Sequence, residues 1–282
     1  MRLLRTAKET LQKEGQGIGE PTAKYGAMTT KSRAPRAIAA PEKGAKPAHS
    51  STGIVVFLLG ALIVAYLFVT NADAKSFETY NFINMGLCLW LPLFTVLLVL
   101  RQEPDQFGLT RGDWKLGQKW ALWAWVAMLL PVAYFAHRAD VQSYYLQGRL
   151  SCWALAGLGV VFDGVRVNLK ALLYYELAMG FYMFGWEFFF RGFLLFGLQK
   201  TALRAGGAVI VQALLFALLH WSWKAHAAKP SLEVLAAFPG GLILGALALK
   251  TRSFLYGYLV HWGISVTLDL FLLAPFIFRH FG

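Results

Sequence analysis

Long apolar segments alternate with short polar turns over most of the chain beyond residue 52. Most of these segments approach the ~20 residues that a helix needs to cross a bilayer. None shows the alternation over about ten residues that is typical of membrane barrel strands. The pattern therefore predicts an all-α, polytopic transmembrane helical bundle of about 6 to 8 spans. The expected spans are 53–72, 80–100, 120–136, 170–200, 208–223, 238–249 and 254–278.

Residues 151–162, SCWALAGLGVVF, are harder to interpret. The segment is too short for an ordinary span, and its length favours a re-entrant or partly buried helix. Whether it crosses decides which side of the membrane the later spans face. The distribution of Lys and Arg between the two sides does not separate the two topologies.

The composition supports a membrane protein rather than a soluble one. Hydrophobic residues make up 57% of the chain and charged residues only 15%. The net charge of +12 could suggest nucleic acid, but residues 1–50 alone hold ten Lys/Arg and four Glu. Most other cations flank apolar segments, as the positive-inside rule predicts. We therefore expect a disordered, basic cytoplasmic tail over 1–51, a transmembrane domain over 52–282, the lipid bilayer as partner and no nucleic acid.

The segment 170–200 carries three ionisable residues inside an otherwise apolar stretch. Glu187 and Arg191 are four residues apart, and Glu176 precedes Glu187 by eleven, so all three lie on one stripe of a helix. Ionisable groups at membrane depth are costly and usually functional. The alternative is an ion pair that only neutralises itself inside the bundle.

Two later spans repeat this arrangement, each with polar residues every fourth position. The first carries Gln212, Phe216 and His220, and the second carries His261, Ser265 and Asp269. Polar stripes turn away from lipid, so the three stripes should face one another. A carboxylate and two imidazoles that meet inside a bilayer form a candidate reactive site.

The motifs GWEFFFRG, FALLH and HWGIS, in this order on three spans, resemble the CAAX protease and bacteriocin-processing (former abortive-infection) family of glutamic-type intramembrane proteases. The resemblance covers about residues 53–275. The family pattern is Glu-Glu-x-x-x-Arg, then Phe-x-x-x-His, then His-x-x-x-Asn. This chain has Ser265 in place of Asn, and Trp186 in place of the first Glu.

The resemblance implies an endopeptidase that cleaves a membrane-associated or CAAX-like peptide with an activated water and no covalent intermediate. Glu187 would be the base, held by Arg191, and His220 would orient the water. His261 with Ser265 would stabilise the oxyanion, and Glu176 and Asp269 would be auxiliary. No cofactor and no metal is implied, and the expected location is the bacterial inner (plasma) membrane.

Two other functions stay open. Trp186 cannot accept a proton, which favours a catalytically inactive member that binds membrane proteins or assists their maturation. Two His and one Glu are also acceptable zinc ligands, which allows a metal-dependent membrane hydrolase or a transporter-like protein. The chain has no HExxH motif, so the sequence gives little support for a metal.

Overall fold

The computed structural model describes residues 51–73, 76–150, 161–162, 166–224 and 228–278. The tail predicted over 1–51 therefore lies outside the described residues, except that Ser51 already begins the first described helix. The described chain is a helical bundle, as predicted, with one short hairpin. Five of its helical stretches are long and apolar enough to cross a membrane, and the protein is thus an integral membrane protein.

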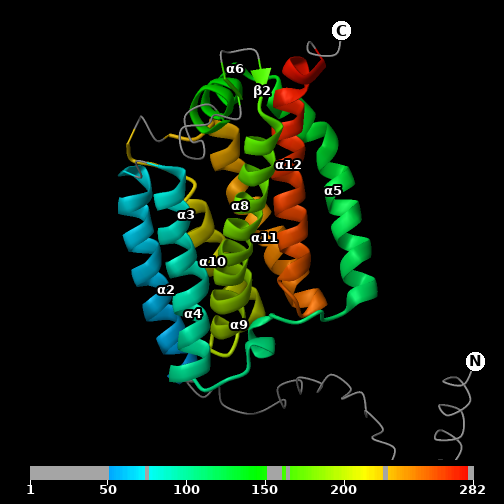
Figure 1. Ribbon diagram of the computed structural model, residues 1–282. Coiled ribbons are helices and arrows are strands. Elements are labelled where there is room, and N and C mark those ends of the chain that lie inside the picture. Colours follow the sequence, from blue (N-terminus) through cyan, green and yellow to red (C-terminus); the bar gives the residue numbers. More distant parts are fainter. Residues whose placement is uncertain (1–50, 74–75, 151–160, 163–165, 225–227, 279–282) are drawn as a thin grey trace, which may run out of the picture. The chain divides into compact units, whose positions relative to one another are not determined.

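Helices that follow one another along the chain lie in one bundle and are joined by turns at its two ends (Figure 1). Three of them continue through π-helical segments: α3–α4 through Gly86–Trp90 and on to Val99, α6 through Ser143–Arg149, and α8–α9 through Phe188–Leu194. The main helices are α2 (Ser51–Thr70), α3 (Phe77–Met85), α4 (Leu91–Phe94), α5 (Trp114–Ala136), α8 (Leu169–Glu187), α9 (Leu195–Leu198), α10 (Arg204–Leu218), α11 (Ser231–Thr251) and α12 (Leu255–Phe278). Short elements between α5 and α8 are α6 (Ala139–Gln142), β1 (Val161–Phe162) and β2 (Arg166–Val167).

Several helix boundaries differ from the sequence prediction. Helix α11 begins at Ser231 rather than at residue 238. Helix α5 begins at Trp114 rather than at Trp120, because the Asp113 carboxylate accepts a hydrogen bond from the Leu116 N–H at 3.0 Å and caps the helix. Helix α10 ends at Leu218, whereas the prediction carried it to Trp223. His220 therefore lies just beyond the helix and not on its face.

One end of the bundle collects four segments that are distant in sequence. Lys200 Nζ donates to Gln102 Oε1 at 2.7 Å, and Gln102 Nε2 donates to Thr52 Oγ1 at 2.8 Å. The Asp113 N–H donates to the Thr251 carbonyl at 2.8 Å. We call this the basic end, and it comprises the start of α2 and residues 100–119, 199–204 and 250–254. Its cations are Arg101, Arg111, Lys115, Lys119, Lys200, Arg204, Lys250 and Arg252.

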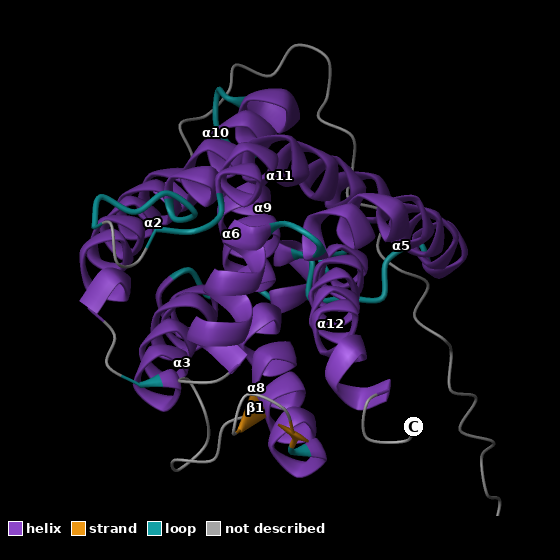
Figure 2. Ribbon diagram, turned by 90° about the horizontal axis from the view of Figure 1, so that it is seen from above, coloured by secondary structure: helices purple, strands orange, loops and turns teal. Residues whose placement is uncertain are grey.

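The opposite end comprises residues 71–73, 76–78, 137–150, 166–170, 219–224 and 228–233. Lys224 forms an ion pair with Asp73, and Tyr145 OH donates to Glu233 Oε2 at 2.8 Å. The helices thus run alternately between the two ends. Figure 2 looks down on the bundle with α9 near its middle.

The segment between α5 and α8 enters and leaves at the opposite end. Helix α8 starts at the opposite end. The evidence is that the ring of Tyr175, in its second turn, stacks on Phe77 at the start of α3, with 5.3 Å between ring centroids. Residues 151–160 and 163–165 lie outside the described residues. Their flanks show no net crossing, which selects one of the two topologies left open by the sequence. Val161–Phe162 pair with Arg166–Val167 as antiparallel strands, so the expected helix over 151–162 is wrong at these two positions.

The C-terminal half of α8 and its continuation form the centre of the core. Every residue from Gly185 to Leu198 is buried, including Glu187 and Arg191. Small residues on α2 allow this close approach, since a Cβ added at Gly60 would lie 2.3 Å from Leu194 Cδ2. The ionisable residues therefore lie in the middle of the bundle and not against lipid.

Candidate active site

Glu187 is the last residue of α8, at the point where the α-helix passes into the π-helical segment Phe188–Leu194. Such widened turns often occur at functional sites. Arg191, one turn further, donates from Nη1 to Glu187 Oε1 at 2.9 Å, and both side chains are 0% exposed. The predicted i,i+4 pair is therefore present and fully buried. Its two opposite charges compensate each other where water cannot solvate them.

His261 on α12 contacts the same carboxylate oxygen. Its Nδ1 donates to Glu187 Oε1 at 2.7 Å, and its side chain is 22% exposed. Because a carboxylate only accepts hydrogen bonds, Nδ1 carries the proton. In the neutral ring, Nε2 is then left as an acceptor. Glu187 therefore fixes both the orientation and the tautomer of His261.

The second oxygen of Glu187 has a different environment. Among the described residues, Glu187 Oε2 is buried and has no hydrogen-bond partner. It faces α12 at Gly257, where an added Cβ would lie 3.3 Å from it. The glycine therefore leaves space for the carboxylate between α8 and α12.

His220 is oriented by the backbone rather than by a carboxylate. Its Nδ1 donates to the carbonyl oxygen of Phe216 at 2.9 Å, and the side chain is almost fully buried. The carbonyl only accepts, so His220 also has its proton on Nδ1 and an acceptor at Nε2. The two histidines thus reach the same tautomer by different contacts.

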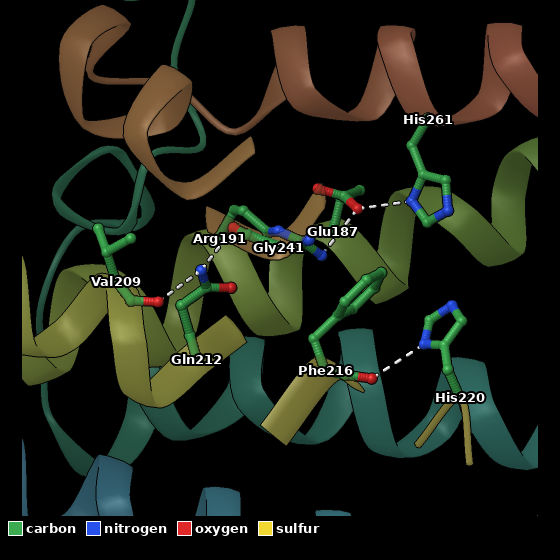
Figure 3. A network of polar contacts seen from close by, with 8 residues as sticks. All are labelled: Glu187, Arg191, Val209, Gln212, Phe216, His220, Gly241 and His261. Atoms are coloured by element: carbon green, nitrogen blue, oxygen red, sulfur yellow. Dashed lines mark hydrogen bonds and ion pairs between the residues drawn. The ribbon is translucent and has the colours of Figure 1, made fainter. Parts of the chain in front are cut away.

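Phe216 connects the charged pair to both histidines. Its ring centroid lies 4.4 Å from that of His220 and 5.8 Å from that of His261. The Arg191 guanidinium carbon lies 3.9 Å from the Phe216 centroid, in a cation–π contact. Figure 3 shows the two imidazoles turned toward each other, with the nitrogens that make no drawn contact on their facing sides.

This arrangement can bind and activate a small donor molecule. Two neutral imidazoles that face each other with acceptor nitrogens cannot hydrogen-bond directly. A water molecule has two O–H groups with which it can donate to such acceptors. A neutral imidazole held by a carboxylate is also a suitable general base.

The other predicted site residues lie further away. Ser265 is one turn beyond His261, is half-buried, and makes no hydrogen bond to the residues that the structure describes. Asp269 is buried, a further turn along α12. Glu176 lies about 16 Å from Glu187 along the helix axis, and its carbonyl accepts from Trp262 Nε1 at 3.2 Å. The structure thus brings together Glu187, Arg191, His220 and His261, and the catalytic roles of all seven residues stay predictions.

Gln212 does not belong to the site, contrary to the predicted stripe. Its Nε2 donates to the carbonyls of Val209 at 2.9 Å and Gly241 at 2.8 Å (Figure 3). A Cβ at Gly245 would lie 2.5 Å from this nitrogen. Gln212 therefore joins α10 to α11 instead of facing the histidines.

Trp186, at the position where the family pattern has its first Glu, is buried in an aromatic group. Its ring centroid lies 5.4 Å from Tyr182, 5.3 Å from Phe190 and 6.5 Å from Phe216. Through Phe216 it adjoins the site. The indole offers only an N–H donor, so it supplies no base there.

The sequence analysis missed a second polar cluster near His220, formed by Lys229, Glu233 and Tyr145. Lys229 Nζ donates to Glu233 Oε1 at 2.6 Å, and Tyr145 OH donates to Glu233 Oε2. Burial alone would lower the pKa of Lys229, but the Glu233 carboxylate outweighs it and raises that pKa above its ordinary value. The i,i+4 spacing of Lys229 and Glu233 was the sequence signal that could have revealed this ion pair. These hydrogen bonds fix the position of residues 228–233 next to His220.

Among the described residues, no group of three or more His, Cys, Asp or Glu side chains is placed to hold a metal ion. Cys88 is a buried free thiol, and Cys152 lies outside the described residues.

A comparison with protein families supports the motif resemblance. The model of a family described as type II CAAX prenyl endopeptidase Rce1-like matches residues 168–267. This range runs from the start of α8 into α12 and contains Glu187, Arg191, His220 and His261. The predicted resemblance to the CAAX protease family is thereby confirmed over residues 168–267. No curated protein and no solved structure matches the chain.

Proposed function

We propose that the protein is an intramembrane endopeptidase that hydrolyses a peptide bond with a water molecule activated between His220 and His261. The observation that carries this proposal is the pair of Nδ1 contacts, one to Glu187 and one to the Phe216 carbonyl. Both contacts leave Nε2 as the acceptor on each ring. The match of residues 168–267 to an endopeptidase family supports the same reaction.

In the proposed reaction, His261 Nε2 takes a proton from the water as its oxygen attacks the peptide carbonyl carbon. Glu187 then stabilises the imidazolium that forms, as a carboxylate does in other acid–base pairs. When the C–N bond breaks, the proton passes from His261 to the leaving amine. The products are a new carboxyl terminus and a new amino terminus, so one water is consumed.

In this scheme His261, and not Glu187, accepts the proton from the attacking water. The family resemblance implied Glu187 as the base. Glu187 Oε1 already accepts hydrogen bonds from Arg191 and His261. The nearby guanidinium favours the charged carboxylate and makes it a weaker base. Ser265 remains the proposed donor to the developing oxyanion, because its hydroxyl lies one turn from His261 on α12.

The proposed substrate is a membrane-associated peptide, with a CAAX-like C-terminal sequence as the first to test. The description of the matched family names a CAAX prenyl endopeptidase. The partial exposure of the His261 side chain is consistent with a peptide that approaches the site from the histidine side.

A second function is favoured by one observation. Trp186 stands where the family pattern has a carboxylate, and its ring is packed against Tyr182, Phe190 and Phe216. This would suit a member that binds membrane peptides without cleaving them. If wild type is inactive and Trp186→Glu gains cleavage, this second function is correct.

The test is cleavage of membrane-associated peptides in proteoliposomes, followed by mass spectrometry. General acid–base groups contribute about 10²–10⁴-fold to such rates, so His261→Gln and His220→Gln should each lose at least about 100-fold. His137→Gln is a matched control, because His137 Nδ1 also contacts a carbonyl four residues earlier, that of Ala133 at 2.8 Å, but lies at the end of α5. A His261→Gln variant that cleaves like wild type would refute the proposal.

A further inference from the structure

Helix α5 is the most peripheral of the candidate membrane spans in the described part of the chain. Only 11% of its apolar window is buried, against 33–39% in the other four spans. It packs on α12 and α11 and lies at one edge of the bundle (Figure 1). The rest of its surface is therefore available to lipid or to a partner.

The outer face of α5 carries lysines near the basic end and apolar side chains beyond them. Five exposed residues recur at every third or fourth position and so share one stripe, namely Lys115, Lys119, Leu122, Val126 and Leu130. The Leu130 side chain is 83% exposed. From Lys119 to Leu130 the helix rises about 16 Å, close to the depth of one leaflet of the hydrocarbon core. The stripe thus has the length and polarity of one phospholipid molecule.

The turn between α11 and α12 places two more exposed cations next to the start of α5. Lys250 Nζ lies 4.5 Å from the ring centroid of Trp120, and Arg252 caps the end of α11. The loop before α5 is fixed to this turn, because the Asp113 N–H donates to the Thr251 carbonyl at 2.8 Å. We call the exposed cations of these two segments the α5 patch, which consists of Arg111, Lys115, Lys119, Lys250 and Arg252.

The charge of the α5 patch selects the kind of partner. Its two segments, 111–120 and 250–252, contain five Lys/Arg and one acidic residue, Asp113. The Asp113 carboxylate is already engaged as the cap of α5. A two-fold dimer through α5 would place two such patches side by side at the same depth, because both copies share one orientation in the membrane. The patch therefore disfavours a second copy and favours an anion.

We propose that the α5 patch binds the headgroup of an anionic phospholipid, with the acyl chains lying along Leu122, Val126 and Leu130. The ammonium and guanidinium groups donate to the phosphate oxygens. The exposed rings of Trp120 and Trp123 lie at the same level, as is typical of aromatic side chains at a membrane interface. The binding involves neither histidine of the candidate active site. It goes beyond the proposed hydrolase function and does not depend on it.

The experiment is native mass spectrometry of the full chain in detergent micelles, titrated with phosphatidylglycerol or with phosphatidylcholine. The patch variant is Lys115→Gln/Lys119→Gln/Lys250→Gln. A charge-preserving variant replaces the same three lysines by Arg. A cation near an anionic surface contributes about fivefold to binding, so the patch variant should bind phosphatidylglycerol at least about tenfold more weakly than wild type. The charge-preserving variant should bind it like wild type.

The matched control is Arg101→Gln/Lys170→Gln/Arg204→Gln, which removes three exposed cations outside the patch and the same net charge. Residues 1–50 are unchanged in every variant, so their ten Lys/Arg contribute equally throughout. The control should bind phosphatidylglycerol within about threefold of wild type. Phosphatidylcholine should bind all proteins weakly and equally, because its headgroup carries a cation that the patch repels.

Four results would overturn the proposal. One is an equal loss in the patch variant and the control, and another is equal affinity of wild type for the two lipids. A third is loss of binding in the charge-preserving variant. Displacement of the lipid by millimolar inorganic phosphate would identify a site for free anions instead. A two-chain species that the patch variant abolishes would likewise assign this surface to a second copy.

Discussion

Replacing Glu187 by Gln removes one charge from the buried pair and leaves the Arg191 guanidinium without an anion. The two groups are 2.9 Å apart and 0% exposed. At an effective dielectric constant of about 20, their attraction is about 6 kcal/mol. Breaking a buried pair on one side typically costs about 3–5 kcal/mol, because the remaining charge stays desolvated. We expect Glu187→Gln to lower the free energy of unfolding by this amount.

The assay is reversible unfolding in mixed micelles of wild type, Glu187→Gln, Arg191→Met and the double variant. Replacing both charges by neutral groups is often close to neutral for stability, so the double variant should recover most of the loss of either single variant. The amide introduced by Glu187→Gln would still offer an oxygen to His261. Asp140→Asn, at the exposed pair of Asp140 with Arg138, is the control and should unfold like wild type. Additive losses for Glu187→Gln and Arg191→Met would refute the coupling.

Three further substitutions separate structural roles from chemistry. Gln212→Leu removes the donor to the Val209 and Gly241 carbonyls and should cost about 1–3 kcal/mol of unfolding free energy while leaving peptide cleavage unchanged. Gly112→Ala should also destabilise by about 1–3 kcal/mol in the same unfolding assay, because its φ is +52° and a Cβ would lie 2.0 Å from the Thr251 carbonyl oxygen. Trp186→Phe should keep the cleavage rate within about threefold, because an indole provides no base; a loss of more than about 100-fold would show that the indole takes part.

The apolar pattern predicted the bundle because each membrane helix must satisfy its backbone internally and be long enough to cross. The four-residue spacing of Glu187 and Arg191 was sufficient to predict their ion pair. The meeting of Glu187 with His261 followed from polar stripes that turn away from lipid. These features depend on the spacing of residues along one helix and on the need of polar side chains to avoid lipid. Both can be read from the sequence.

Other features depend on contacts between distant segments. Helix α10 ends at Leu218, although the apolar run LLHWSW continues without a Gly or Pro to stop it. The hydrogen bond from His220 Nδ1 to the Phe216 carbonyl follows from that ending. Gln212 was misplaced because its partner carbonyl at Gly241 lies on another helix. The π-helical turn after Glu187 has no local sequence signal that we recognise.

The most direct test of the hydrolase assignment is peptide cleavage in proteoliposomes prepared in H₂¹⁸O. If a water activated between His220 and His261 attacks the peptide bond, mass spectrometry should find one ¹⁸O in the new terminal carboxyl group at early times. His261→Gln should give at least about 100-fold less of this product. Unlabelled product, or equal labelled product from wild type and His261→Gln, would contradict the account.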